Sequence, residues 1–170
     1  RAGHMPVDVL DFKRALGQFA SGVTVVTTKD AKGVFHGITV SAFCSLSLDP
    51  PMVLICIEKS AGSHDALSQA KAFVVNILSS TQIDLSEQFA SLLPDKFFGV
   101  SHRSGVNDMP VLEGVVASLE CSLKQVCDGG DHTIFIGLVE NVSINDGFPL
   151  VYSRSSYWTI SEPFPDGVSE

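Results

Sequence analysis

The chain has 170 residues, a usual length for one domain with a substantial apolar core. Its formal net charge is −8 at pH 7, and it contains only 11 Lys and Arg residues, so the basic surface that nucleic acids and anionic membranes require is not expected. Charged residues make up 18% of the chain, below the ~25% of typical soluble domains. This low share predicts that part of the surface is buried in a homodimer.

The termini and the cysteines place further limits on the protein. The first residues, 1–5, are interpreted as the remnant of an expression tag, residues 6–162 as a single domain, and residues 163–170 as a flexible tail. No apolar run reaches the ~18 residues of a membrane span and no signal peptide is recognisable, so we expect a cytoplasmic protein. The four cysteines lack Cys-x-x-Cys spacing, which predicts reduced thiols and no metal site.

An amphipathic helix and a hairpin are predicted at the start of the chain. Asp8 is a suitable N-cap, and apolar residues then recur on one face until Gly22 ends the run. Residues 23–28 are all β-branched and predict a strand. The turn at 29–33 leads into a second strand, so the two strands should form a hairpin.

Residues 37–51 are the most distinctive segment, because small hydroxyl side chains alternate there with apolar ones. The polar members are Thr39, Ser41, Ser45 and Ser47, and the apolar members are Val40, Ala42, Leu46 and Leu48. Alternation of this kind places one set on each face of a strand. The segment therefore predicts a cradle for a small polar ligand with its apolar face turned inward.

Two continuous apolar runs, at 51–57 and 73–78, predict central strands, with short helices capped by Ser63 and Thr81 nearby. From Val115 a long alternating strand is predicted. One of its faces carries Leu119, Cys121 and Leu123, and the other carries the polar Ser118, Glu120, Ser122 and Lys124.

Asp128-Gly-Gly130 should turn this strand into another at 134–139. Strands that arrive in hairpins, without a Gly-x-Gly-x-x-Gly motif, argue against a doubly wound dinucleotide-binding fold. The pattern favours a closed antiparallel barrel with a few flanking helices.

Three groups of side chains are candidates for ligand binding, each with a structural alternative. His132 ends a Gly-Gly-Asp-His sequence that could deliver it to a ligand, although Asp131 and His132 could equally form a solvated turn pair. Lys59 could neutralise a ligand phosphate or be an ordinary surface lysine. Lys96 and the aromatic residues near it could cover a planar ring or pack in the core. The scattered histidines offer no base for a Ser or Cys nucleophile, which argues against a hydrolase.

Taken together, the sequence resembles the short-chain flavin reductases, which are the reductase components of two-component flavin-dependent monooxygenases. The matching blocks lie in the expected order and spacing over about residues 8–160. They are residues 12–28, 37–51, 73–78, 96–97, 130–132, 149–152 and Tyr157. The resemblance implies an FMN-binding split β-barrel of antiparallel Greek-key type, mainly β with flanking helices, that works as a homodimer. It also implies that NAD(P)H reduces FMN or FAD, which then diffuses to a partner monooxygenase.

The resemblance also assigns candidate residues to the two cofactors. Those implied for the flavin are Thr39, Val40, Ser41, Ala42, Cys56, Ile57, Glu58, Lys59, Phe89, Ala90 and Lys96. His132, with Tyr152 and Tyr157, is implied to form the nicotinamide pocket, where His132 positions the nicotinamide. NADH is favoured over NADPH because no Arg-rich site for a 2′-phosphate is visible. The alternative is a flavin-binding or flavin-carrying barrel without nicotinamide-dependent activity.

Overall fold

The computed structural model describes residues 7–160, so the expected tag remnant at 1–5 and the tail at 163–170 lie outside the described residues. The helices are α1 (Val9–Leu16), α2 (His64–Gln69) and α3 (Ile83–Ala90). The strands are β1 (Ser21–Gly22), β2 (Thr24–Lys29), β3 (Phe35–Val40), β4 (Phe43–Leu48), β5 (Pro51–Glu58), β6 (Ala72–Ile77), β7 (His102–Ser104), β8 (Pro110–Leu112), β9 (Ala117–Gly129), β10 (His132–Ile144), β11 (Leu150–Ser153) and β12 (Ser156–Thr159). Within residues 7–160, none of the helices is both long enough and apolar enough to cross a membrane.

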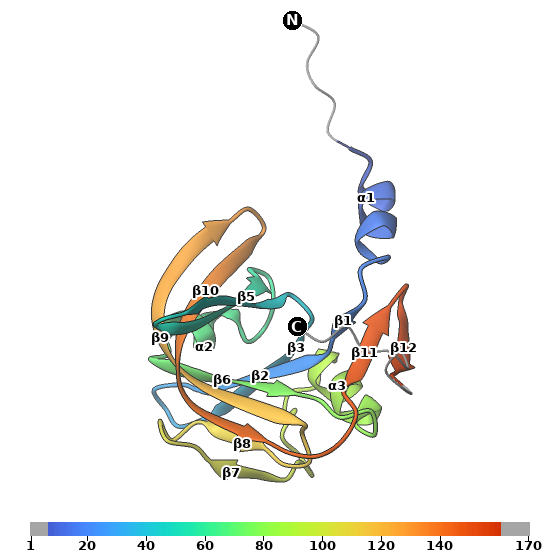
Figure 1. Cartoon of the computed structure of the whole chain (residues 1–170). Coiled ribbons are helices and arrows are strands. Elements are labelled where there is room, and N and C mark those ends of the chain that lie inside the picture. Colours follow the sequence, from blue (N-terminus) through green and yellow to red (C-terminus); the bar gives the residue numbers. More distant parts are fainter. Residues whose placement is uncertain (1–6, 161–170) are drawn as a thin grey trace, which may run out of the picture.

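A curved antiparallel sheet of seven strands, in the order β3-β2-β6-β9-β10-β5-β4, forms the body of the protein (Figure 1). Smaller sheets, β1-β11-β12 and β7-β8, flank it. The expectation of a mainly β, antiparallel fold with few helices is confirmed. In the described part of the chain β3 and β4 stand at the two ends of the strand order and do not pair with each other, so the predicted closed barrel is not observed.

Both predicted hairpins are present. Strands β2 and β3 pair from Thr24 opposite Val40 to Lys29 opposite Phe35, and Gly33 adopts a φ of 82° in the turn between them. Strands β9 and β10 pair from the Gly129–His132 end, with Gly130 at a φ of 80°. A left-handed backbone is most easily adopted by glycine, which explains why these turns contain it.

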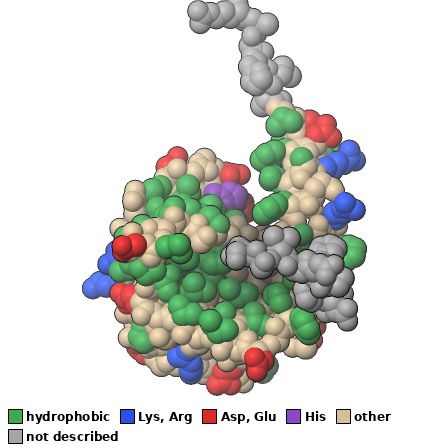
Figure 2. Space-filling model, in the orientation of Figure 1, with side chains coloured by type: hydrophobic (Ala, Val, Ile, Leu, Met, Phe, Trp, Pro, Cys, Tyr) green, Lys and Arg blue, Asp and Glu red, His purple; other side chains and the backbone are tan. Residues whose placement is uncertain are grey.

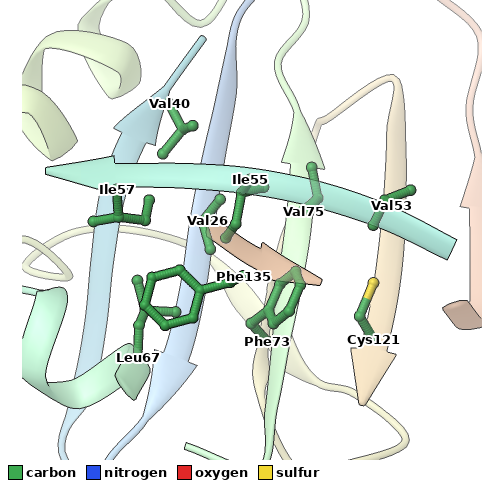
Figure 3. Close-up of a cluster of buried hydrophobic side chains, with 10 residues drawn as sticks. All are labelled: Val26, Val40, Val53, Ile55, Ile57, Leu67, Phe73, Val75, Cys121 and Phe135. Atoms are coloured by element: carbon green, nitrogen blue, oxygen red, sulfur yellow. The ribbon is translucent and has the colours of Figure 1, made fainter. Parts of the chain in front are cut away.

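The main core lies on the concave side of the sheet (Figure 3). Alternate residues of β5, Val53, Ile55 and Ile57, point into it and meet Phe73 of β6 and Phe135 of β10. Burial on one face of β5 leaves the intervening residues, Cys56 among them, on the opposite face. A second cluster, with Phe89 as its largest member, lies beneath α3.

The middle of the sheet departs from the predicted alternation of β9. Glu120 was expected on a polar face, yet its residue is only 1% exposed. Its carboxylate accepts hydrogen bonds from the backbone N–H of Val106 at 2.5 Å and from Nδ2 of Asn141 at 2.9 Å. The β7–β8 hairpin covers this face of β9, so a polar residue can be buried there because its oxygens are satisfied.

Helix α1 is shorter and more exposed than the sequence predicted. The Asp8 cap is confirmed, since its side chain accepts from the backbone N–H of Leu10 at 2.8 Å. The helix ends at Leu16 instead of continuing to Gly22, and Phe12 is 52% exposed. Figure 1 shows α1 projecting from the body of the protein.

The hydroxyl-rich segment and the cap of α3 also differ from the prediction. Residues 37–51 divide into β3 and β4, with Ser41 and Ala42 between the two strands. Leu48 is 93% exposed, because β4 ends the strand order and no described element covers its outer side. Gln82, and not Thr81, occupies the N-cap position of α3.

Candidate functional site

Three strands converge on a cavity of about 220 Å³, which we call the β3–β5 cavity. Its wall comes from the end of β3, the end of β5 and the first residue of β10. The lining residues are Ile38, Thr39, Val40, Ser41, Ala42, Cys56, Ile57, Glu58, Ala61 and His132. Most of the predicted site residues therefore share one cavity, and Ile38 and Ala61 are additions that no sequence pattern marked.

Strand register explains why residues distant in sequence meet there. His132 on β10 lies opposite Glu58 on β5, and the backbone N–H of Cys56 donates to the carbonyl of Ala42 at 3.0 Å. This pairing of residues between the strands thus brings the Ser41–Ala42 connection close to the end of β5 and the start of β10. The backbone amides of Ser41 and Ala42 lie outside the strands, where a ligand can accept from them.

His132 is held by its sequence neighbour. Its Nδ1 lies 2.7 Å from Oδ1 of Asp131, so the ring donates from Nδ1 and leaves Nε2 for a ligand. This hydrogen bond is also the main reason that the pKa of the Asp131 carboxyl is lowered. The turn pair proposed as a structural alternative is present, but it coexists with a His132 that lines the cavity.

Lys59 does not line the β3–β5 cavity. Its Nζ donates to Oδ1 of Asp128 at 2.5 Å and to the carbonyl of Gly130 at 2.6 Å. The backbone N–H of Lys59 donates to the carbonyl of Asp131 at 2.9 Å. These contacts tie Lys59 to the β9–β10 turn, and the ammonium lowers the pKa of the Asp128 carboxyl.

A second cavity of about 210 Å³, the tyrosine cavity, lies on the other side of Thr39 and Ser41. Its lining residues are Val23, Thr39, Ser41, Ser86, Ala90, Tyr152 and Tyr157. The rings of Tyr152 and Tyr157 meet edge to face, with centroids 5.3 Å apart. His132 is not among these residues, so the structure divides the predicted nicotinamide residues between two cavities that share Thr39 and Ser41.

Ser86 organises the boundary between these cavities. Its hydroxyl lies 2.9 Å from the hydroxyl of Tyr157, and its carbonyl accepts from Oγ1 of Thr39 at 2.6 Å. Ser86 is fully buried, yet no motif in the sequence around it marks it as a candidate. A serine on the inner face of a helix is recognisable as a site residue only when its partners from other elements are known.

A third cavity of about 260 Å³, the Lys96 cavity, adjoins the β3–β5 cavity. Its lining residues are Phe35, His36, Gly37, Gly62, Ser63, Ser91, Leu92, Leu93, Pro94 and Lys96. Burial lowers the pKa of Lys96. Its Nζ donates to the carbonyl of Phe89 at 2.9 Å. The sequence marked only Lys96 among these residues, because the others come from three separate segments.

Phe89 supports the site from below and does not line any of the three cavities. Its ring is completely buried and meets the ring of Phe97 edge to face, with centroids 5.1 Å apart. A Cβ added at Gly37 would lie 2.6 Å from Cδ1 of Phe89. The absence of a side chain at Gly37 therefore lets β3 lie close against this ring. Phe89 therefore packs in the core, which is the structural alternative to covering a ligand ring.

The chemistry of the β3–β5 cavity suits a flat, largely uncharged heterocycle. Ile38, Ala42 and Ala61 supply apolar walls, while the hydroxyl of Ser41 and the nearby backbone amides supply neutral donors. Ligand sites commonly combine mostly apolar walls with a few placed polar groups. An isoalloxazine ring, with apolar faces and a polar edge, fits this donor set.

Comparison with known proteins gives consistent results. Residues 16–161 match the family described as "Flavin reductase like domain". The chain is 41% identical over 161 residues to a Rhizobium meliloti protein named "Probable flavin reductase", covering 91% of this chain and 51% of that protein. The chain thus spans about half the length of that relative.

Two further relatives match over larger shares of their length. One is the reductase subunit of a flavin-dependent monooxygenase from Rhodococcus jostii, 40% identical over 152 residues, with 89% of this chain and 77% of that protein covered. The other is the NADH:FAD oxidoreductase of Streptomyces globisporus, solved in complex with NAD and FAD fragments. Its structure has a TM-score of 0.84 and 34% identity, and covers 95% of this chain and 98% of that chain.

Proposed function

The chain belongs to the family of flavin reductase-like domains, and from this premise we propose that it reduces free FMN or FAD by hydride transfer from NAD(P)H. The observation that supports the proposal is the β3–β5 cavity, where Thr39–Ala42, Cys56–Glu58 and His132 meet around apolar walls and neutral donors. NADH is the proposed donor. None of the residues lining the three cavities is an arginine, and arginine is the usual partner of the 2′-phosphate of NADPH.

In this proposal the side chains position the two ligands, and the flavin itself takes part in the reaction. A bound flavin supplies the hydride acceptor, so the protein has to bring two rings together at near-attack distance. Ala42 and Ala61 contact the flavin ring, and the amides of Ser41 and Ala42 donate to its polar edge, where reduction develops negative charge. Modest affinity is expected from such neutral contacts, which suits a flavin that is released after reduction.

The tyrosine cavity is the proposed place of the nicotinamide. Because it shares Thr39 and Ser41 with the β3–β5 cavity, ligands in the two cavities would meet at these residues. Tyr157, fixed by Ser86, and Tyr152 would bind the nicotinamide nucleotide. His132, fixed by Asp131, would orient the nicotinamide from the β3–β5 side as a positioning residue.

The proposed partners are a second copy of the chain and a monooxygenase that receives the reduced flavin. The monooxygenase is suggested by the reductase subunit from Rhodococcus jostii. The second copy is suggested by hydrophobic side chains that gather on one face of the protein and along α1 (Figure 2). Leu48 on β4 and Phe12 on α1 are among the exposed ones. We also propose that each copy has the split-barrel fold of the family. The curvature of the sheet and the contact between β3 and β5 support this proposal.

Initial rates of NADH and NADPH oxidation, each with FMN and with FAD, test the function. We expect turnover with NADH and at least one of the flavins. Failure of all four combinations would refute the proposal. A protein that retains flavin tightly but oxidises neither nucleotide would be the flavin carrier that the sequence left as the alternative.

A further inference from the structure

We propose that Lys59 and Asp128 form a clamp on the β9–β10 turn, residues 128–131, and that this clamp holds His132 in position for the nicotinamide of NAD(P)H. The inference rests on the proposed function, because it concerns the residue that orients the hydride donor. Lys59 and Asp128 lie outside the lining of the β3–β5 cavity. They are therefore positioning residues, which act on the nicotinamide through His132.

The clamp joins the residue that follows β5 to most of the β9–β10 turn. Nζ of Lys59 donates to Oδ1 of Asp128 at 2.5 Å and to the carbonyl of Gly130 at 2.6 Å. The backbone N–H of Lys59 donates to the carbonyl of Asp131 at 2.9 Å. One residue thus fastens three of the four turn residues to the end of β5.

His132 depends on this turn for its orientation. The pairing of β10 with β5 ends where His132 lies opposite Glu58, and the contacts of Lys59 continue the attachment into the turn. Nδ1 of His132 lies 2.7 Å from Oδ1 of Asp131, whose backbone carbonyl Lys59 holds. The side chain of His132 is 41% exposed, so packing alone does not fix the ring. Movement of the turn would therefore move the imidazole.

At Gly130 the turn is not restrained by packing. Its φ is 80°, and among the described residues no heavy atom beyond its immediate neighbours lies within 4 Å of a Cβ built there. Glycine has the largest conformational freedom of any residue. A polar contact has to hold the backbone at this point, and the hydrogen bond from Nζ of Lys59 supplies it.

The charges of the clamp favour this role over phosphate binding. An ammonium has three N–H donors, and Lys59 uses two of them on the turn. The Asp128 carboxylate offsets the charge of the ammonium, and their hydrogen bond is the main reason that the pKa of the Asp128 carboxyl is lowered. The two side chains are 43% and 80% exposed. Such an exposed pair contributes little to the free energy of unfolding, so its removal should displace His132 without unfolding the protein.

Steady-state kinetics of Lys59→Met and Asp128→Asn, with NADH and flavin varied in turn, tests the clamp. Each substitution should raise KM for NADH about three- to fivefold, as expected for the loss of an exposed ion pair. KM for flavin should stay within about twofold of the wild type, because His132 orients the nicotinamide. Lys59→Arg keeps a donor for Asp128 and should restore most of the affinity for NADH.

A second background tests whether the clamp acts through His132. In His132→Ala neither Lys59→Met nor Asp128→Asn should raise KM for NADH further, because the group that the clamp positions is absent. Calorimetric titration with riboflavin and FMN, without any nicotinamide nucleotide, gives a readout independent of catalysis. Lys59→Met should not distinguish the two flavins, since the clamp does not contact the phosphate.

Lys29 and Asp108 provide the matched control. This Lys–Asp pair joins β2 to the segment between β7 and β8, and it lines none of the three cavities. Lys29→Met and Asp108→Asn remove an ion pair of the same chemistry. They should leave both KM values unchanged.

Four results would overturn the inference. Weaker FMN with unchanged riboflavin in Lys59→Met would assign the ammonium to the flavin phosphate. Unchanged KM for NADH in both clamp variants would show that His132 is held without them. Equal increases of KM for NADH and flavin would make the clamp a general support of the site. A further increase in the His132→Ala background would show that the clamp acts by another route. A wild type that oxidises neither nucleotide would instead refute the proposed function itself.

Discussion

Gly37→Ala is the substitution whose effect follows most directly from the structure. The added Cβ would lie 2.6 Å from Cδ1 and 3.5 Å from Cζ of Phe89. Phe89 cannot easily withdraw, because it is fully buried and packs edge to face on Phe97 at 5.1 Å. Either α3 or β3 must therefore move.

Overpacking of this kind typically costs about 1–3 kcal/mol. In a domain of this size each kcal/mol lowers Tm by roughly 2–4 °C, so a loss of about 6 °C is expected in the middle of the range. Flavin affinity should fall as well. Gly37 directly precedes Ile38 and Thr39, both of which line the β3–β5 cavity, and a shift of β3 would move them.

Urea unfolding and thermal denaturation measure the stability change, and flavin titration measures the change at the site. Gly22→Ala is the matched control, since nothing lies within 4 Å of a Cβ added there. Phe89→Leu combined with Gly37→Ala should recover part of the lost stability, because the smaller side chain leaves room for the methyl group. If Gly37→Ala is as stable as Gly22→Ala, the close packing of β3 on Phe89 is wrong.

Three further predictions concern separate parts of the protein. Asn76→Ala should lower the free energy of unfolding by about 1–3 kcal/mol in urea titrations, because it leaves the buried backbone N–H of Leu112 unpaired; an unchanged free energy of unfolding would contradict this role. His132→Ala should raise KM for NADH more than KM for flavin in steady-state assays, and equal increases would remove His132 from nicotinamide positioning. Burial raises the pKa of Cys121 to about 12 from the ordinary 9.0, so above pH 9 the unfolded chain loses a proton that the folded chain keeps. The free energy of unfolding should therefore fall with rising pH by up to about 1.4 kcal/mol per pH unit from this group, and Cys121→Ala should show the shallower slope.

Local sequence signals were sufficient for the hairpins. The β-branched run of β2 and the glycines of its turn mark one hairpin, and Asp128-Gly-Gly130 marks the other. Both signals act within a few residues, where turn geometry and strand preference decide the structure. For this reason the sequence predicts both hairpins correctly.

Burial of individual faces was harder to predict, because it depends on what packs against a strand. Glu120 is buried because the β7–β8 hairpin covers β9. Leu48 is exposed because nothing in the described chain covers the outer side of β4. Alternation in sequence distinguishes two faces of a strand, but it does not identify the face that a distant element will cover.

The candidate site was predicted only where its residues carry a local motif. The Thr39–Ala42 segment and the Gly-Asp-His sequence were recognised, and the sheet register brings them to one cavity. Ser86 and most of the Lys96 cavity were missed, since their roles depend on contacts between α3, β3 and the loop before α2. Lys59 was expected near a ligand, but the Asp128 carboxylate and the Gly130 carbonyl hold it at the turn.

The most direct test of this account is hydrogen exchange of the backbone amides with and without saturating FAD. Ser41 and Ala42 lie between β3 and β4, outside the strands, so their amides should exchange rapidly in the free protein. Saturating FAD should slow exchange there and at Cys56–Glu58, while exchange in β8 is unchanged. Unchanged exchange at Ser41 and Ala42 would place the flavin outside the β3–β5 cavity and contradict the proposed site.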